Sequence, residues 1–199
     1  FGDLAAAYQG KKYAGFKGGP MHWRVLDPVK DNCGKEGAVF MITEELVGDM
    51  DDKGKRHSLR YNPKGASNAY HSSYMPEWCA GFRRNAFTDA EQKAMRCISK
   101  QDGSEYFGDY SGVVLYNDGS GHWDYYTAKK GLYTKEDRID DQYIFLPSFM
   151  EVKDYIGTSL SAVRSYINGS KACWWTRSPL DKNYVSMCYE GTQTKNHPN

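Results

Sequence analysis

Several features that mark common protein classes are missing from this sequence. It has no hydrophobic run long enough to span a bilayer and no signal-peptide core. Its five cysteines include no CxxC pair, so the spacing of a zinc site is missing. Lys plus Arg number 26 against 25 for Asp plus Glu, so there is no basic excess of the kind that nucleic-acid binders carry. We therefore expect a processed or excised soluble domain without membrane insertion, nucleic-acid partner, metal or cofactor.

Motifs for hydrolysis and for calcium are also missing. There is no GxSxG, and the five histidines fall at strand edges or in polar segments, as surface histidines do. Residues 49–54 begin like an EF-hand loop, but Arg60 occupies the position where a bidentate Glu is needed. A solvated acidic turn is the better interpretation of that segment.

The sequence is rich in aromatic residues, with 16 Tyr and 5 Trp in 199 residues. Tyr and Trp suit strands as well as recognition surfaces, because each has an apolar ring and a polar tip. The length fits one domain over residues 1–199, with an N-terminal arm at 1–19 and a Tyr- and Gly-rich insertion at 101–138. No internal repeat divides it.

Local patterns predict the main elements. Strands are expected at residues 22–27, 38–43, 143–147, 172–179 and 184–189, and a long polar loop at 49–74. The apolar run at 38–43 predicts burial on both faces. Helices are expected within 76–98 and at 148–155. Within the insertion, a small strand at 113–116 and a turn at 117–119 predict a hairpin.

Two capping boxes locate helix starts. Thr88 and Glu91 form one, and Ser148 and Glu151 form the other. The first helix has a buried side at Trp78 and Phe82, and Arg83 and Arg84 are expected in solvent. For the second helix, the pattern predicts a buried side made of Ala90, Ala94, Met95 and Ile98.

The segment at residues 172–179, Ala-Cys-Trp-Trp-Thr-Arg-Ser-Pro, is the centre of this interpretation. Successive side chains of a strand point to opposite sides, so Trp174 and Trp175 must contact different faces. Arg177 then shares a side with Trp175, and Pro179 ends the strand. A strand with apolar bulk on both faces is expected in the middle of a domain.

In chain order, Trp-Arg-Val-Leu-Asp at 23–27, Ala-Phe-Thr-Asp-Ala-Glu at 86–91, Ile-Phe-Leu-Pro-Ser at 144–148 and Trp-Trp-Thr-Arg-Ser-Pro at 174–179 resemble an uncharacterised bacterial family. Its members are domains on secreted or surface proteins with a C-type lectin-like fold. The resemblance covers roughly residues 20–191. It implies an α+β fold in which two helices pack on antiparallel sheets with long loops, and it implies a bacterial extracellular or cell-surface location.

The resemblance has further consequences for individual residues. It implies structural positions for Trp23, Phe87, Phe145, Trp174 and Trp175. The family continues after residue 191 into a closing strand of the type Gly-Val-Arg-Pro-Ala, which this chain lacks, so either the sequence is cut short or this strand is missing, and 184–189 is expected to be the last strand. The Glu-Pro-Asn, Gln-Pro-Asp and Trp-Asn-Asp motifs of sugar-binding lectins are also missing. No catalytic residue is carried over.

Cys173 and Cys188 flank the last hairpin at distances from its turn that could place them opposite each other. They predict a structural disulfide or two buried thiols. Because the lectin-like fold is shared with formylglycine-generating oxidases, an oxidase that uses Cys173 and Cys188 is an alternative function.

The insertion supplies the candidate binding site. Its aromatic residues lie among Gly, Ser, Asn and Asp, as in antigen-binding loops, although they could instead pack as a small core. Arg177 either anchors an anionic ligand or holds loops through backbone carbonyls. The candidate ligand-binding residues are Tyr106, Tyr110, Tyr116, Trp123, Asp124, Tyr125, Tyr126 and Arg177.

These residues favour a non-enzymatic recognition domain that binds a protein or a glycan through aromatic loops. The alternatives are the oxidase and a structural spacer module of a surface or phage-tail protein.

Overall fold

The computed structural model describes part of the chain. For the short strands near both termini and in the insertion it describes the backbone alone. The described residues are 2, 13–14, 20–44, 46–50, 53, 56–57, 59–63, 69–101, 116–117, 123–124, 137–148, 151–156, 166–167, 170–171, 174–179, 185–189 and 192–196. The predicted arm at 1–19 therefore lies mostly outside them, as does most of the insertion.

Helix α1 (Met75–Ala86) carries the first hydrophobic core on one side. Its buried residues recur at helical spacing, and the Trp78 and Phe82 rings stack with centroids 5.5 Å apart. Phe87 closes this core edge-on to Phe82 at 5.6 Å, and Trp23 packs against Phe87 at 6.2 Å. The predicted buried side of this helix is confirmed.

Helix α2 (Asp89–Ala94) begins at the predicted capping box, since the Thr88 hydroxyl accepts from the Glu91 amide and Glu91 accepts from the Thr88 amide. The predicted buried side is wrong. No residue of α2 is buried, and Ala90 and Ala94 are exposed. Met95 and Ile98 do pack against the two cores, but both follow the end of the helix. The helix has fewer than two turns, and Glu91 attaches it to the rest of the chain by accepting from the Gly2 amide at 2.8 Å.

Strands β2 (Trp23–Asp27) and β3 (Phe40–Thr43) form an antiparallel pair close to the predicted bounds. The predicted burial on both faces of the second strand is wrong. All four residues of β3 are only partly buried, and Val39 just before it is 49% exposed. In the described part of the chain β3 pairs with β2 alone, so this hairpin lies at the surface instead of inside a larger sheet.

The segment predicted as a long polar loop holds ordered elements. Strands β4 (Gly48–Met50) and β5 (Arg56–His57) join β1 (Tyr13–Ala14) in the order β1-β4-β5, and η1 (Tyr70–Ser72) precedes α1. Tyr61 and Tyr70 are fully buried in a second core, which they form with Met75, Ile98 and Ile139. The loop prediction fails because the segment is polar in composition, although the rings of its two tyrosines are buried in the core.

Strand β6 (Ile98–Lys100) pairs with β9 (Ile139–Gln142), so the two ends of the insertion lie side by side. The strand predicted at 143–147 is wrong by several residues, because the paired strand ends at Gln142. Within the insertion, β7 (Tyr116–Asn117) and β8 (Trp123–Asp124) pair antiparallel. The predicted strand and turn are displaced, because Asn117, expected in the turn, pairs with Trp123, and the rest of the predicted strand and turn lies outside the described residues.

The C-terminal sheet has the order β12-β13-β14, from β12 (Trp174–Pro179), β13 (Val185–Tyr189) and β14 (Thr192–Asn196). The pair β10 (Tyr166–Ile167) and β11 (Ser170–Lys171) precedes it. Strand β14 corrects the expectation that the strand at 184–189 is the last one. The alternating Thr-Gln-Thr-Lys-Asn sequence is polar, and it forms the strand by pairing with β13 over five residues.

The two indoles of β12 contact different clusters, as predicted. Trp175 packs edge-on against Tyr61 at 5.6 Å and donates to the Leu59 carbonyl, whereas Trp174 packs against Val152 of η2 (Val152–Ile156), a π-helical turn. Strand β12 is nevertheless at the edge of its sheet. Residue 147 lies beside this strand, where the Arg177 amide donates a hydrogen bond to the Pro147 carbonyl at 2.9 Å.

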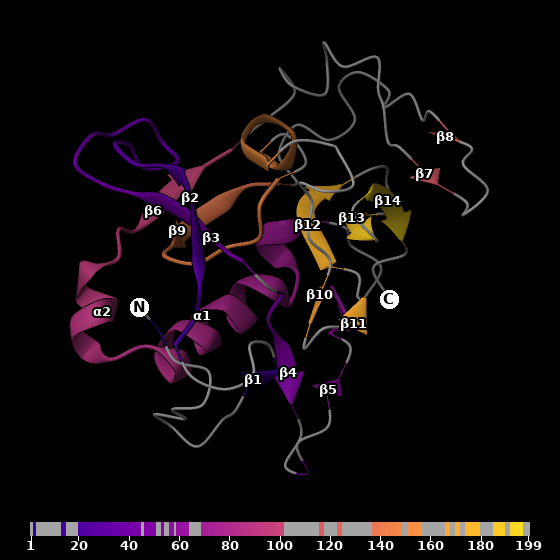
Figure 1. Cartoon of the computed structure of the whole chain (residues 1–199), viewed down its shortest axis with the longest axis horizontal. Coiled ribbons are helices and arrows are strands. Elements are labelled where there is room, and N and C mark those ends of the chain that lie inside the picture. Colours follow the sequence, from indigo (N-terminus) through magenta and orange to yellow (C-terminus); the bar gives the residue numbers. More distant parts are fainter. Residues whose placement is uncertain are drawn as a thin grey trace.

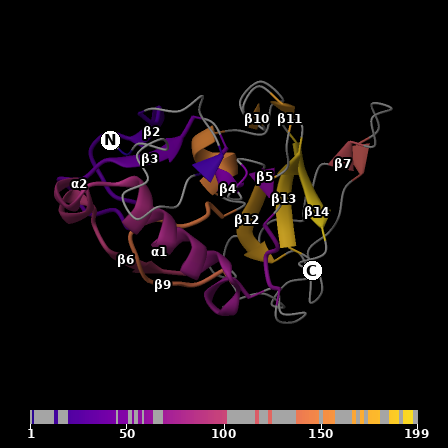
Figure 2. The same cartoon turned by 90° about the horizontal axis from the view of Figure 1, so that it is seen from below.

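The fold is α+β with small antiparallel sheets, as expected (Figure 1). The two helices lie toward one end of the molecule and β12-β13-β14 toward the other, in both views (Figures 1 and 2). The β7–β8 hairpin lies beyond this sheet, with β7 next to β14. None of the helices described is long and apolar enough to cross a membrane.

Matched substitutions on the two helices test these assignments. Phe82→Ala removes a ring that is 3% exposed and should lower the free energy of unfolding by about 3–5 kcal/mol. Ala94→Gln on exposed α2 should change it by less than about 0.5 kcal/mol. Urea unfolding measures both, and a large loss for Ala94→Gln would contradict the exposed position of α2.

Candidate functional site

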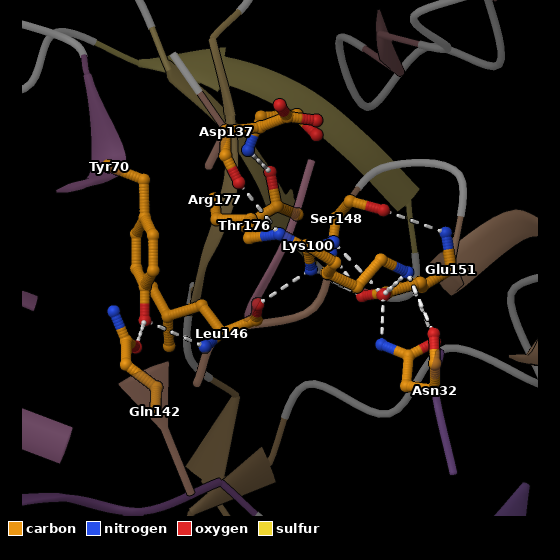
Figure 3. A network of polar contacts seen from close by, with 11 residues as sticks. Asn32, Tyr70, Lys100, Asp137, Gln142, Leu146, Ser148, Glu151, Thr176 and Arg177 are labelled. Carbon is orange, nitrogen blue, oxygen red and sulfur yellow. Dashed lines mark hydrogen bonds and ion pairs between the residues drawn. The ribbon is translucent and has the colours of Figure 1, made fainter. Parts of the chain in front are cut away.

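A buried carboxylate is the common partner in a network of polar contacts (Figure 3). Glu151, at the start of η2, is 4% exposed. It accepts from the Ser148 amide at 2.7 Å, from Arg177 at 3.0 Å and from Lys100 at 2.9 Å, and also from the Asn32 side chain. We call Asn32, Lys100, Glu151 and Arg177 the Glu151 cluster.

The local sequence explains why Glu151 points inward. Pro147 precedes Ser148, and the Ser148 hydroxyl accepts from the Glu151 amide at 3.1 Å while Glu151 accepts from the Ser148 amide. This is the predicted capping box, with both bonds present. Since Ser148 is fully buried, the box fixes the carboxylate inside the protein.

Arg177 approaches the carboxylate from β12 and is fully buried. Two of its nitrogens bond both oxygens of Glu151, a bidentate geometry that fits the planar guanidinium. The guanidinium also donates to two backbone carbonyls, from Nε to Asp137 at 3.1 Å and from a terminal nitrogen to Leu146 at 3.0 Å. The guanidinium carbon also lies 5.7 Å from the centre of the Phe145 ring. One side chain therefore joins β12 to residues 137–151.

Lys100 and Asn32 complete the cluster from the opposite side. The Lys100 ammonium donates to Glu151 and to both the backbone and side-chain oxygens of Asn32, each at 3.2 Å. An ammonium has three N–H groups, so it can donate to three acceptors at once. The loop around residue 32 and strand β6 are thereby attached to η2.

The charges around Glu151 decide its protonation. Burial alone raises its pKa, but the positive charges of Arg177 and Lys100 and the hydrogen bonds from Arg177 and Asn32 outweigh burial. The result is a pKa lowered from 4.5 to about 2, so the group is ionised at neutral pH. A carboxylate held in this state is an acceptor and an anchor, and it is a poor proton donor.

The structure places the predicted ligand-binding residues in different situations. Tyr116, Trp123 and Asp124 lie on the β7–β8 hairpin, for which the backbone is described, and Tyr106, Tyr110, Tyr125 and Tyr126 lie outside the described residues. Arg177 lies inside the protein, and its bonds to two backbone carbonyls are those expected if it holds loops together. Cys173 is outside the described residues, and Cys188 pairs in register with Trp174.

Glu151, Lys100 and Asn32 were not singled out by sequence reasoning as partners of Arg177. The capping box was a signal for Glu151, since a buried box leaves its carboxylate facing inward. No local signal marks Lys100 or Asn32, which are 51 and 119 residues from Glu151 in the chain.

Metal ligation finds no support in the part of the chain that the structure describes. His, Cys, Asp and Glu side chains there form no group of three or more suited to a metal ion. Asp49, the first residue of the EF-hand-like segment, accepts a hydrogen bond from the Trp78 indole at 2.8 Å. That carboxylate thus contributes to the packing of α1.

Comparison of this chain with protein-family models, with curated proteins and with solved structures finds no match.

The lowered pKa of Glu151 predicts acid sensitivity. A carboxyl whose pKa is lower in the folded state stabilises the fold above its unfolded pKa, and this stabilisation disappears as the pH falls from 4.5 toward 2. The loss should be on the order of 3 kcal/mol, and it should be missing from Glu151→Gln. Urea unfolding between about pH 6 and about pH 2 measures it.

Asp140→Asn is the control, because its ion pair with Arg138 is 53% exposed on the Asp140 side. This variant should keep the wild-type pH profile, since exposed pairs contribute little. An unchanged profile in Glu151→Gln would contradict the role given to Glu151.

Removing the guanidinium should be costly because it leaves a buried charge with too few partners. Arg177→Met is expected to lower the free energy of unfolding by about 3–5 kcal/mol. Arg24→Met, at the partly exposed Arg24–Glu44 pair of 3.0 Å, should cost less than about 1 kcal/mol. Similar losses in the two variants would show that the buried pair is no stronger an anchor than a surface pair.

Proposed function

We propose that this chain is a non-enzymatic recognition domain with a C-type lectin-like fold that binds a protein or a glycan through its aromatic insertion. The location that suits this role is extracellular or on a bacterial cell surface. The proposal concerns the insertion between β6 and β9, whose Tyr and Trp residues stand among small polar residues.

The observation that carries the proposal is the position of the β7–β8 hairpin. This hairpin carries Tyr116, Trp123 and Asp124 and lies next to β14, beyond the C-terminal sheet and away from the helices (Figure 1). Binding residues commonly sit on loops held by a rigid scaffold. The three-stranded sheet beside the hairpin is such a scaffold. A ligand bound at the hairpin would not need to contact the core around the helices.

The use of the charged residues inside the molecule agrees with a binding role. Arg177, Glu151 and Lys100 bond to one another and to the backbone, so their charge serves to hold elements together. The α+β class with antiparallel pairs and two helices supports the lectin-like architecture at the level of element types.

The test uses the full chain on a broad array of glycans and proteins, followed by titration of any ligand found. Trp123→Ala combined with Tyr125→Ala should weaken binding by roughly thirtyfold, as loss of an aromatic hot spot does, and should leave the melting temperature nearly unchanged.

Tyr143→Ala is the matched control, because this tyrosine is 40% exposed and stacks under Arg83 of α1, at the helical end. It should bind like the wild type. Equal affinity of all three proteins would refute the aromatic site, and a failure to find any ligand would favour a structural spacer.

A further inference from the structure

The loop between β2 and β3 lies along strand β6 (Figure 1). Three contacts align them. Arg96 bonds Asp31 at 3.0 Å, the Cys33 thiol donates to the Ser99 carbonyl at 3.9 Å, and Lys100 bonds the Asn32 carbonyl at 3.2 Å. The short stretch 31–33 thus runs beside 96–100, although the two are more than sixty residues apart in the chain.

The conformation of this loop is set by Asp31, which is 8% exposed. One of its carboxylate oxygens accepts from the amides of Cys33 and Lys35, each at 2.9 Å, and Gly34 supplies the positive φ of 78° at the turn. The position of Cys33 relative to β6 is therefore fixed by bonds on both sides of it.

Cys33 and Cys97 are both exposed thiols. Side chains alternate along β6: Ile98 is buried, and Cys97 and Ser99 on either side of it are exposed. Asp31 is attached at residue 96 and Cys33 at residue 99, so Cys97 lies between the two points where the loop is attached. Both thiols are therefore exposed on segments that contact each other.

We propose that Cys33 and Cys97 are a redox pair that closes to a disulfide when the protein meets a low-molecular-weight disulfide such as oxidised glutathione. Cys97 lies about 7 Å along the strand from Ser99, the residue that Cys33 touches, at two residues of roughly 3.3 Å each. Disulfides need Cα atoms roughly 4.4–6.8 Å apart, so the loop must shift along β6 from Ser99 toward Cys97 and give up its Cys33–Ser99 contact for the bond to form.

The reaction balances by thiol–disulfide exchange. One cysteine thiolate attacks the small disulfide, whose S–S bond breaks and releases one small thiol. The second cysteine thiolate then attacks the mixed disulfide, forms the Cys33–Cys97 bond and releases the other small thiol. The two cysteines lose two protons and two electrons in all, and the small disulfide is reduced to two thiols.

This bond would fasten the tip of the β2–β3 hairpin to β6 beside the Glu151 cluster. It closes a long loop of chain, and a cross-link of that length reduces the freedom of the unfolded state. The proposal goes beyond the recognition role, since it concerns a different surface and stands whether or not the insertion binds a ligand.

The experiment incubates the reduced full chain with oxidised glutathione, alkylates remaining thiols and maps peptides by mass spectrometry without reduction. The expected product is one cross-linked species joining the Cys33 and Cys97 peptides, lighter than the two thiol peptides by two hydrogen masses. Oxidation should raise the melting temperature by roughly 5–10 °C in the wild type and leave it unchanged in Cys33→Ser and Cys97→Ser.

Internal and variant controls make the result decisive. Cys79 is buried, and burial raises the pKa of its thiol to about 12, so it should remain a thiol throughout. In each serine variant the remaining partner should keep glutathione as a stable mixed disulfide. Separate glutathione adducts on both Cys33 and Cys97 in the wild type, or a bond from either one to Cys173 or Cys188, would overturn the proposal.

Discussion

The ion pair between Glu151 and Arg177 is the interaction on which the arrangement of the later half of the chain depends. Two charges are removed from water there, and Lys100 adds a third. Such a cluster is tolerable only where every donor meets an acceptor, because desolvation of each ion costs several kcal/mol. Few arrangements of the chain give every donor an acceptor, because β12, the turn at Ser148 and strand β6 must all be in place together. Hydrophobic packing alone accepts more than one arrangement, so this cluster contributes specificity as well as attachment.

The size of the sheets explains why side-chain contacts matter so much here. In the described part of the chain the sheets have two or three strands, and most pairs are two to five residues long. Isolated ladders of this length are marginal in water. What joins them is contact between elements, such as the Trp175 indole on the Leu59 carbonyl and the Tyr70 hydroxyl between Gln142 and the Leu146 amide. The two cores meet at α1, which contributes Trp78 to one and Met75 to the other.

Sequence reasoning succeeded where the cause is local. The boxes at Thr88 and Ser148, the buried side of α1 and the opposite contacts of the two indoles all follow from residues within a few positions of each other.

It failed where partners are distant or where composition misleads. The apolar run before Thr43 looked like an interior strand, yet among the described strands it pairs with β2 alone and lies at the surface, which no local pattern reveals. Polar β14 exists because β13 pairs with it, and Tyr61 is a core residue inside a polar segment. The salt bridge of Arg177 could not be predicted either, since Glu151 is 26 residues away and its orientation depends on the fold.

The outer side of β12 has a consequence for behaviour at high concentration. An unprotected edge strand can recruit a strand from another molecule and so begin aggregation. Here the amide of Arg177 already donates to Pro147, and Pro179 has no amide to offer at the end of the same strand. The segment beside this edge contains Pro147, which has no backbone N–H, so at that residue it cannot donate a hydrogen bond to a further strand. The pair of prolines thus acts as a built-in stop against growth of the C-terminal sheet from this side.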